Sequence, residues 1–390
     1  MNSVTARAPG KVNLLLRVGP LGADGYHPLV TVFQAVDLYE QVTATALEPE
    51  AGAPAPNAPA SGIRITASGP GSEHVPLDQT NLAYKAAAAL AARLGIPANV
   101  ALHIVKGVPV AGGMAGGSAD AAATLVACNE LWGGGLSQTE LLELAAALGS
   151  DVPFSLMGGT AIGTGRGHLL TPIKTNAEFH WAFAIQSQGL STPKVFQKFD
   201  QMLAENSIQS ESSLRDSATS ALWPSAQNDV GGSACSGDSA LLDVFASNPQ
   251  NDIGGLWDSQ ASLPVNDVGE FNRHSAQGAF ATPSQNLGGV EILGGIVGAL
   301  EVGDIAELAG ELVNDLQAPA LALRPELANT IEVAKQVGAL GVLISGSGPT
   351  VAALAPSGIV ARQIAKQWQQ TQTAAQTVIA KTTTKGAHLI

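Results

Sequence analysis

A glycine-rich segment at residues 109–124 constrains the fold of this chain more than any other feature. It reads Pro-Val-Ala-Gly-Gly-Met-Ala-Gly-Gly-Ser-Ala-Asp-Ala-Ala-Ala-Thr, a glycine turn that continues directly into an alanine-rich helix. Because glycine lacks a Cβ, such a turn can adopt positive φ and direct successive backbone N–H groups at one anion. A helix that starts near Ser118 would direct its positive end at the same anion. The segment therefore predicts a cradle for a polyphosphate.

Two widespread phosphate-binding motifs do not fit this segment. A Walker A loop requires a lysine between glycine and serine, whereas Ser118 follows Gly117 directly. A dinucleotide-binding fingerprint requires Gly-x-Gly, which the segment lacks. Taken alone, the segment is also compatible with a tight turn packed closely against a sheet. Other residues must decide between a phosphate site and such a turn.

Composition and charge exclude several classes of protein. A hydrophobic content of 45% in 390 residues supports a globular chain of two or three domains. The formal net charge of −13, with no local cluster of Lys and Arg, argues against nucleic-acid binding. The two cysteines form no Cys-x-x-Cys and the seven histidines have no metal-ligand spacing. We therefore expect neither a disulfide framework nor a zinc site.

The chain shows no sequence signal for a membrane. Residues 1–11 contain no apolar signal-peptide core, and no run approaches the roughly 18 apolar residues that a membrane span requires. We expect a cytoplasmic protein that does not bind membranes.

Hydrophobic periodicity places the glycine turn between a strand and a helix, as a phosphate cradle requires. Ser137 and Glu140 have the spacing of a capping box for a helix that continues to Leu148. Further helices are predicted at residues 81–94, 305–316 and 325–337. Strands are predicted at residues 12–18, 30–36, 42–46, 100–105, 180–185, 342–345 and 350–354, with a strand pair at 160–170.

Residues 206–290 differ in composition from the rest of the chain. They are rich in Ser, Asn, Gln, Asp and Gly, and carry nine acidic residues against two arginines. Their repeats, such as those at 227–232 and 250–255, are too irregular for a solenoid. The composition is typical of a disordered insertion, although Trp223, Phe245, Trp257 and Phe271 leave open a small docking element. We expect an N-terminal domain at 1–175 and a C-terminal domain at 176–390, which this insertion interrupts.

Four short motifs accompany the glycine segment. They are Ala-Pro-Gly-Lys-Val-Asn-Leu at 8–14, Asp-Gly-Tyr-His at 24–27, Gly-Ser-Asp-Val-Pro at 149–153 and Ser-Gly-Ser-Gly-Pro at 345–349. In this order, the five motifs resemble those of the GHMP kinases. The Asp-Gly-Tyr-His motif and the Gly-Ser-Asp-Val-Pro motif are similar to motifs of the family members that act on 4-diphosphocytidyl-2-C-methyl-D-erythritol. The resemblance covers most of residues 7–201 and, less closely, residues 294–354.

The resemblance implies a fold and an activity. The fold is α+β, with an N-terminal domain like domain 2 of ribosomal protein S5 and a ferredoxin-like C-terminal domain. The active site would lie between the two domains. The activity is ATP- and Mg²⁺-dependent phosphorylation of the 2-hydroxyl of the cytidyl alcohol, a step of the non-mevalonate (MEP) route to isoprenoids.

Lys11 and Asp151 correspond to the catalytic pair of the family. Phosphoryl transfer to an alcohol requires a proton acceptor and positive charge beside the transferred group. A carboxylate on a polar turn suits the first role, and a nearby ammonium suits the second. Without the surrounding motifs, Asp151 would be interpreted as a turn residue and Lys11 as a solvated surface charge.

The resemblance also implies a nucleotide site. Asn81, Leu82 and Lys106 would surround the adenine, although Lys106 also fits a surface lysine at a strand end. Ser118 would offer its hydroxyl to a phosphate or to Mg²⁺, a role compatible with a helix N-cap. The phosphate loop would consist of Pro109, Val110, Ala111, Gly112, Gly113, Met114, Ala115, Gly116, Gly117 and Ser118.

For the acceptor, Tyr26 and Phe196 match family positions that enclose the cytosine ring. His27 would form hydrogen bonds with the edge of the base, and Asn13 would position the hydroxyl groups of the acceptor. Stacking between aromatic rings contributes about 1–3 kcal/mol per base. Core packing is the alternative for Tyr26 and Phe196, and a hydrogen-bonded turn histidine is the alternative for His27.

Some features depart from the family pattern and leave other functions open. Gly10 stands where the family more often has alanine, and Met114-Ala115 replaces Leu-Gly. The alternatives are another small-molecule GHMP kinase, acting on homoserine, mevalonate or a sugar, and a catalytically silent nucleotide-binding module. We expect a monomer or a weak homodimer.

Overall fold

The computed structural model describes residues 2–48, 62–110, 112–175, 177–205 and 290–390. The predicted insertion therefore lies outside the described residues, apart from Val290, and so does Ala111 of the glycine turn. The described residues up to Phe199 and those from Val290 onward belong to one compact unit. Both sheets and the candidate site belong to this unit.

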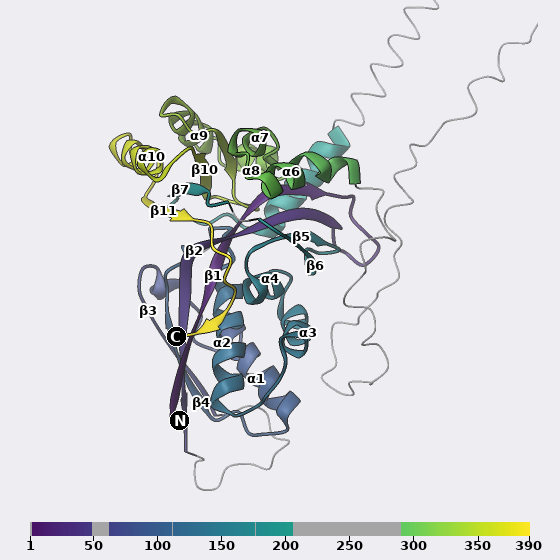
Figure 1. Cartoon of the computed structure of the whole chain (residues 1–390), viewed down its shortest axis with the longest axis vertical. Helices are drawn as coiled ribbons and strands as arrows, with labels where there is room; N and C mark the ends of the chain where they lie inside the picture. The colour runs from purple at the N-terminus through teal and green to yellow at the C-terminus, as the bar shows by residue number, and fades with distance from the viewer. Residues whose placement is uncertain (1, 49–61, 111, 176, 206–289) are drawn as a thin grey trace, which may run out of the picture. The chain divides into compact units, whose positions relative to one another are not determined.

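The larger sheet has eight strands and forms the frame of the N-terminal part (Figure 1). Its main path runs β12-β1-β2-β4-β3, with β5 and β8 pairing onto β2 and β1 and β6 pairing onto β5. The strands are β1 (Ser3–Val18), β2 (Leu29–Ala46), β3 (Ile63–Ser68), β4 (Val100–Val105), β5 (Thr160–Thr164), β6 (Leu169–Ile173), β8 (Val313–Asn314) and β12 (His388–Leu389).

Strand β2 corrects the prediction of two separate strands at 30–36 and 42–46. The segment is one strand, whose pairing with β1 shifts between Pro9 and Gly10. A β-bulge of this kind inserts extra residues without ending a strand, and it bends the strand locally. The polar residues at 37–41 mark this irregularity rather than a turn. The bulge directly precedes Lys11 in the chain.

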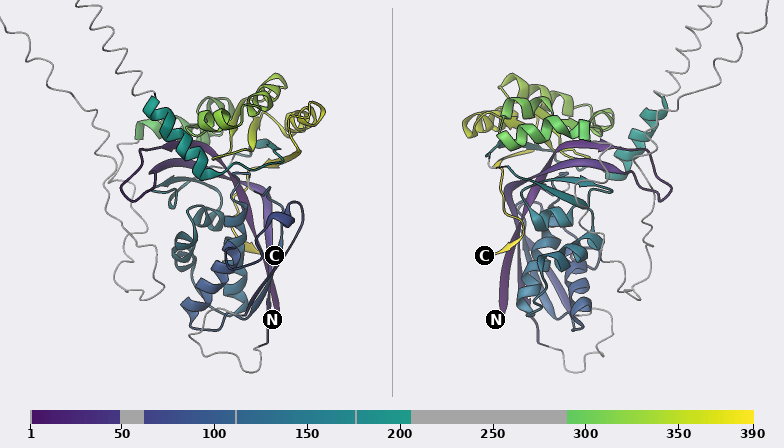
Figure 2. Two further views of the ribbon diagram at one scale, coloured as in Figure 1. Left: turned by 180° about the vertical axis from the view of Figure 1, so that it is seen from behind. Right: turned by 45° about the vertical axis from the view of Figure 1, so that its right-hand side comes forward.

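Four helices gather on one face of the larger sheet (Figure 2). They are α1 (Leu82–Leu94), α2 (Gly116–Leu131), α3 (Gln138–Leu148) and α4 (Val152–Met157), and the 3₁₀-helix η1 (Ser72–His74) precedes them. Alanines of α1 and α2 are buried in one core cluster with the strands, because their small side chains allow close packing. The predicted capping box of Ser137 and Glu140 is confirmed at the start of α3.

The smaller sheet has four antiparallel strands in the order β11-β7-β10-β9. These are β7 (His180–Ile185), β9 (Gly341–Ile344), β10 (Val351–Ala355) and β11 (Gln376–Lys381). In chain order the arrangement is fourth, first, third, second, which is the ferredoxin-like order and confirms the predicted fold class. The helices are α6 (Val290–Val302), α7 (Ile305–Gly310), α8 (Gln317–Leu323), α9 (Leu327–Gln336) and α10 (Gly358–Gln370), and residues 192–205 are also helical.

The predicted helix at 305–316 is wrong in its second half. Helix α7 begins as expected after Asp304, whose carboxylate caps it, but it ends at Gly310, which has low helix propensity. The chain then forms strand β8, parallel to β1. The Asn314 side-chain amide on β8 donates to the carbonyls of Ile344 and Gly346, at 2.7 Å each. These long-range contacts, which periodicity does not reveal, favour the strand.

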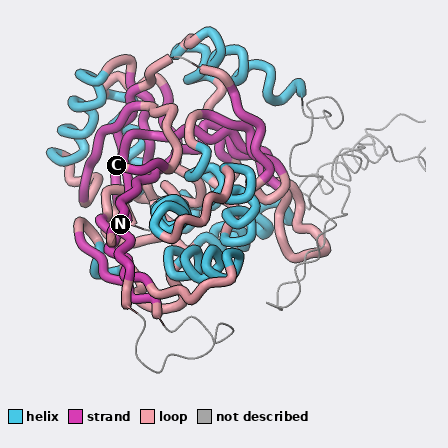
Figure 3. The backbone as a smooth tube through the Cα atoms, turned by 60° about the horizontal axis from the view of Figure 1, so that its bottom comes forward, coloured by secondary structure: helices cyan, strands magenta, loops and turns pink. Residues whose placement is uncertain are grey.

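The two sheets share buried contacts. Trp181 of β7 is fully buried, and its indole N–H donates to Gln34 of β2 at 3.1 Å. A core cluster combines apolar residues of both sheets with residues of α6 and α7. The C-terminal strand β12 returns to pair with β1, which brings the two ends of the chain side by side (Figure 3).

The domain boundary near residue 175 stays a prediction. Among the described helices, none combines the length and apolar character of a membrane span.

Candidate active site

The glycine turn borders a cavity of about 360 Å³. The predicted adenine residues Asn81, Leu82 and Lys106 line this cavity together with the loop. The structure therefore brings together three segments that the sequence analysis assigned to one nucleotide. The loop residues in the wall are Pro109, Val110, Gly112, Gly113, Met114, Ala115, Gly116 and Gly117, and the remaining lining residues are His74, Val75, Pro76, Thr80 and Asp120.

The loop passes into α2 earlier than predicted. The helix begins at Gly116 rather than near Ser118, and its N-cap is Ala115, with φ of 61° and no capping side chain. The interpretation of Ser118 as the N-cap is therefore wrong, because this half-buried residue lies within the first turn. A left-handed backbone costs a non-glycine residue roughly 1–2 kcal/mol. Ala115 is thus a strained residue at the point where the helix amides open toward the cavity.

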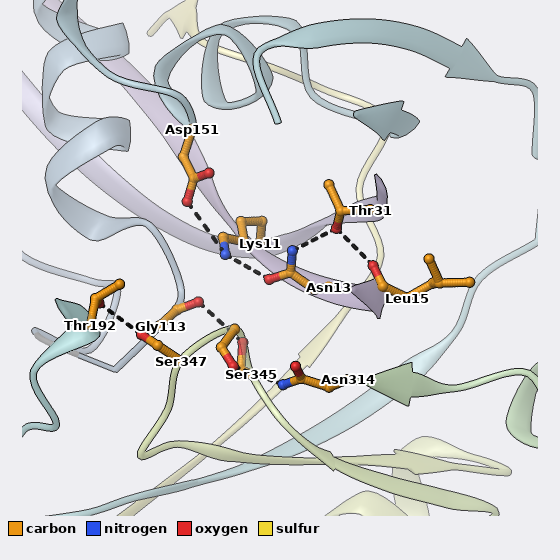
Figure 4. Close-up of polar contacts among 11 residues, drawn as sticks. Lys11, Asn13, Leu15, Thr31, Gly113, Asp151, Thr192, Asn314, Ser345 and Ser347 are labelled. Carbon is orange, nitrogen blue, oxygen red and sulfur yellow. Dashed lines mark hydrogen bonds and ion pairs between the residues drawn. The ribbon is translucent and has the colours of Figure 1, made fainter. Parts of the chain in front are cut away.

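Two glycines of the loop are needed because a second glycine turn packs against them. A Cβ on Gly113, whose φ is +72°, would lie 2.2 Å from the carbonyl oxygen of Ser345. A Cβ on Gly112 would lie 2.6 Å from the Thr350 hydroxyl, which is buried and has no hydrogen-bond partner. The Ser345 hydroxyl donates to the Gly113 carbonyl at 3.2 Å (Figure 4). The β9–β10 turn therefore fixes the shape of the loop.

Lys11 lies beside this junction and is buried. Its backbone N–H donates to the carbonyl of Met114 at 3.1 Å, which attaches β1 to the loop. Its ammonium donates to Asn13 Oδ1 at 2.7 Å and lies 3.4 Å from Asp151 Oδ2 (Figure 4). The residue is 5% exposed, so the alternative of a solvated surface charge is wrong. The ammonium is thus held between an amide and a carboxylate.

Asp151 occupies the N-cap position of α4 but caps nothing. Its side chain accepts no hydrogen bond from the helix amides. Asp304, at the same position of α7, accepts from the amides of Ala306 and Glu307. The Asp151 carboxylate instead faces Lys11 and is 30% exposed, so a ligand can reach it. Pro153, the second residue of α4, has no N–H for the carboxylate to cap, and the Asp151 carboxylate is directed at Lys11 instead.

Asn13 is held in place by a short chain of hydrogen bonds. Its amide donates to the Thr31 hydroxyl at 2.8 Å, and that hydroxyl donates to the Leu15 carbonyl at 2.7 Å. All three side chains are buried within β1 and β2. In this structure, Asn13 therefore positions Lys11.

The predicted acceptor residues lie near one another, but in an arrangement that differs from the expected ring pair. His27, rather than Tyr26, stacks on Phe196, with ring centroids 5.0 Å apart. The His27 Nδ1 lies 2.9 Å from the Gly19 carbonyl oxygen. Tyr26 is 47% exposed, which excludes core packing, and the Arg166 guanidinium lies 4.4 Å from the centroid of its ring.

Lys106 is not the surface lysine that the sequence allowed. Its ammonium lies 2.6 Å from Glu40 Oε1 and 2.6 Å from Asp120 Oδ2, and all three residues are buried. Burial, and next the charge of Asp120, raises the pKa of Glu40 to about 8. Burial also raises the pKa of Asp120. Burial lowers the pKa of Lys106, but the two carboxylates outweigh it and raise that pKa. We call Glu40, Lys106 and Asp120 the buried ion cluster.

Sequence reasoning missed Glu40, Asp120, Asn314 and Thr350. Asp120 stands within the glycine motif, so an acidic residue among the alanines that follow the turn was an available signal. Glu40 and Asn314 carry no local signal, because their partners are distant in the sequence. Among the described residues, no group of three or more His, Cys, Asp or Glu side chains could hold a metal.

Two family models match the chain. The model of the GHMP kinases N terminal domain matches residues 81–159, and that of the GHMP kinases C terminal domain matches residues 296–373. The first falls within the range that the motifs covered, and the second begins within residues 294–354 and extends beyond them to residue 373.

Curated relatives match over nearly the whole chain. The 4-diphosphocytidyl-2-C-methyl-D-erythritol kinase of Streptomyces coelicolor is 42% identical over 363 residues, which cover 93% of this chain and 91% of that protein. The protein of the same name from Thermobifida fusca is 39% identical, with coverage of 100% and 98%. A crystal structure of 4-(cytidine 5'-diphospho)-2C-methyl-D-erythritol kinase is similar in fold, with a TM-score of 0.60, 23% identity and coverage of 97% and 98%. A homoserine kinase from Cytophaga hutchinsonii also gives a TM-score of 0.60, at 17% identity and coverage of 100% and 98%.

The buried ion cluster predicts how stability depends on pH. Because the pKa of Glu40 is raised, the folded protein retains a proton that the unfolded chain releases above its ordinary pKa of 4.5. The corresponding stability is complete below that value and is lost as pH rises through about 8, with a slope approaching about 1.4 kcal/mol per pH unit. Glu40→Gln should remove this part of the decrease in Tm between pH 5 and 8.

Glu140→Gln is the matched control, since Glu140 lies in the α3 capping box and its pKa is lowered by hydrogen bonds from Ser137. This variant should keep the wild-type decrease in Tm over that range. An equal decrease in wild type and Glu40→Gln would show that Glu40 does not hold the proton.

Proposed function

Because the chain belongs to the 4-diphosphocytidyl-2-C-methyl-D-erythritol kinases, within the GHMP kinases, we propose that Lys11 and Asp151 are its catalytic pair. The enzyme phosphorylates 4-diphosphocytidyl-2-C-methyl-D-erythritol in the MEP route to isoprenoids, and the 2-hydroxyl is the proposed acceptor. The observation that supports this assignment best is the 3.4 Å contact between the Lys11 ammonium and the Asp151 carboxylate, at the edge of the glycine loop.

Asp151 is the proposed general base. Its carboxylate accepts the proton of the acceptor hydroxyl as that oxygen bonds to the γ-phosphorus of ATP. The bond from the γ-phosphorus to its bridging oxygen breaks, and ADP leaves with that electron pair. The Lys11 ammonium stabilises negative charge on the phosphoryl oxygens.

The glycine loop is the proposed phosphate site. Residues 112–117 line the cavity and α2 begins at Gly116, so the backbone amides of the loop and the positive end of the helix suit the phosphates of ATP. Magnesium sites in kinases use one or two protein ligands together with phosphate oxygens, so the lack of an acidic cluster in the described residues fits such a site. Mg²⁺, held by the Ser118 hydroxyl and the phosphates, would shield the charge of the transferred group.

The acceptor site is proposed at the turn that carries Tyr26 and His27. Tyr26 presents an exposed aromatic ring, and Phe196 lies under the His27 imidazole. A cytosine placed between Tyr26 and Phe196 would have to displace that imidazole from the Phe196 face. His27 would then be available to form hydrogen bonds with the edge of the base.

Specific observations argue against the two alternative functions. The fold does not distinguish substrates, because a homoserine kinase matches as well as the cytidyl alcohol kinase structure. Identity of about 40% over nearly the full chain favours the cytidyl alcohol. A silent binding module would not need a buried lysine against an uncapped aspartate. We propose that the enzyme is cytoplasmic and acts as a monomer or a weak homodimer.

Replacement of the proposed base should reduce turnover. Asp151→Asn keeps the shape of the side chain but cannot take the proton, so kcat should decrease by about 10²–10⁴-fold. Release of ADP in the presence of the cytidyl alcohol measures this rate. Asp304→Asn, at the other aspartate N-cap, should keep wild-type kcat. A wild-type kcat for Asp151→Asn would remove Asp151 from the role of base.

Replacement of Tyr26 should affect one substrate only. Tyr26→Ala removes the stacking surface, so KM for the cytidyl alcohol should rise about tenfold or more while KM for ATP stays unchanged. Tyr26→Phe retains the ring and should restore the low KM. CDP should compete with the alcohol in the wild type. Lack of competition by CDP, or equal KM values for Tyr26→Ala and wild type, would contradict the cytidyl site.

A further inference from the structure

The buried ion cluster joins three elements of the larger sheet and its helices. Glu40 lies on β2, Lys106 directly follows β4, and Asp120 lies in the second turn of α2. One ammonium contacts both carboxylates at 2.6 Å, with almost no solvent exposure of the three side chains. Burial of charges is costly unless they are paired, and here two carboxyl groups share a single cation. The arrangement calls for an explanation beyond stability.

The cluster also contacts the start of the glycine loop. The second carboxylate oxygen of Glu40 accepts the backbone N–H of Gly107 at 3.0 Å. A Cβ on Gly107 would lie 2.2 Å from the carbonyl oxygen of Tyr39, so the loop starts in direct backbone contact with β2. The loop therefore begins at a point that Glu40 fixes.

The far end of the loop rests on the same cluster. A Cβ on Gly116, the first residue of α2, would lie 2.9 Å from Glu40 Oε1 and 3.6 Å from Lys106 Nζ. Asp120, one helical turn further along α2, is drawn toward the sheet by its contact with Lys106. Both ends of the loop, at residues 107 and 116, are therefore set by the same three side chains.

We propose that Glu40, Lys106 and Asp120 are positioning residues that hold the glycine loop in the shape that receives the polyphosphate of the nucleotide. This inference rests on the proposed nucleotide site. It also assigns the Lys106 ammonium to the two carboxylates rather than to the adenine, although Lys106 and Asp120 are both among the residues that line the cavity. The cluster then acts on the phosphates through the loop and makes no contact with the base.

This role has a consequence that a purely structural role lacks. Loss of the cluster should weaken ligands that carry phosphates and leave a ligand without phosphates unaffected. Adenosine and ADP differ only in the diphosphate, so the ratio of their inhibition constants reports the state of the loop. If Lys106 instead bound the base, both ligands would weaken together.

Glu40→Gln is the informative variant. Glutamine replaces one of the two carboxylate oxygens with an NH2 donor, so a donor then faces either the Gly107 N–H or the Lys106 ammonium. The remaining ammonium and Asp120 carboxylate form a neutral pair, which favours folding of the variant. Loss of a hydrogen bond that involves a charged group should raise the inhibition constant of ADP, measured against ATP, about tenfold. The inhibition constant of adenosine should rise less than twofold.

A second variant and a control accompany it. Gly116→Ala places a methyl group against Glu40 from the loop side and should change the ADP constant in the same direction. Thr330→Val removes a buried hydrogen bond to Thr373, far from the loop in sequence, and should change neither constant. Wild-type protein that fails to bind ADP would contradict the proposed function itself. Where it binds, unchanged ADP inhibition in either variant, or equal weakening of adenosine, overturns the positioning role.

Discussion

The site depends on the close backbone contact between two glycine turns that lie more than two hundred residues apart in the chain. Gly113 approaches Ser345 so closely that no side chain fits between them, and a hydrogen bond of 3.2 Å from the Ser345 hydroxyl joins the turns. This contact connects the N-terminal glycine loop to the smaller sheet. Because Asn314 holds the carbonyls of the second turn, strand β8 belongs to the same support. The geometry of the loop is therefore a property of both sheets together.

Lys11 directly follows the irregular pairing of β1 with β2 and lies against the glycine loop. The irregular pairing between β1 and β2 at Gly10 places the next residue under the loop, where its backbone bonds to Met114. Its ammonium is buried and pairs with Asn13 and Asp151. In a buried environment, such charges interact more strongly than at the surface. A short strand irregularity thus stands directly before the cation that pairs with Asp151 beside the glycine loop.

Short local patterns in the sequence predicted much of this structure, but contacts between residues that are distant in the chain could not be predicted from them. The capping box at Ser137, strand β4 before the loop and the order of the smaller sheet follow from short patterns or family resemblance. The start of α2 was misplaced because Ala115 adopts a conformation usually reserved for glycine. Periodicity also failed at β8, where contacts with β1 and the β9–β10 turn override helical spacing. Glu40 carried no signal, since its charge acquires meaning only beside partners from other elements.

A crystal structure with a non-hydrolysable ATP analogue and the cytidyl alcohol tests the central claim most directly, that one nucleotide lies on the glycine loop beside Lys11 and Asp151. The phosphates should accept hydrogen bonds from backbone amides of residues 112–118. The Lys11 ammonium should lie within hydrogen-bond distance of the γ-phosphate, and the Asp151 carboxylate within that distance of the acceptor hydroxyl. Phosphates bound away from this loop, or an acceptor hydroxyl out of reach of Asp151, would contradict the claim.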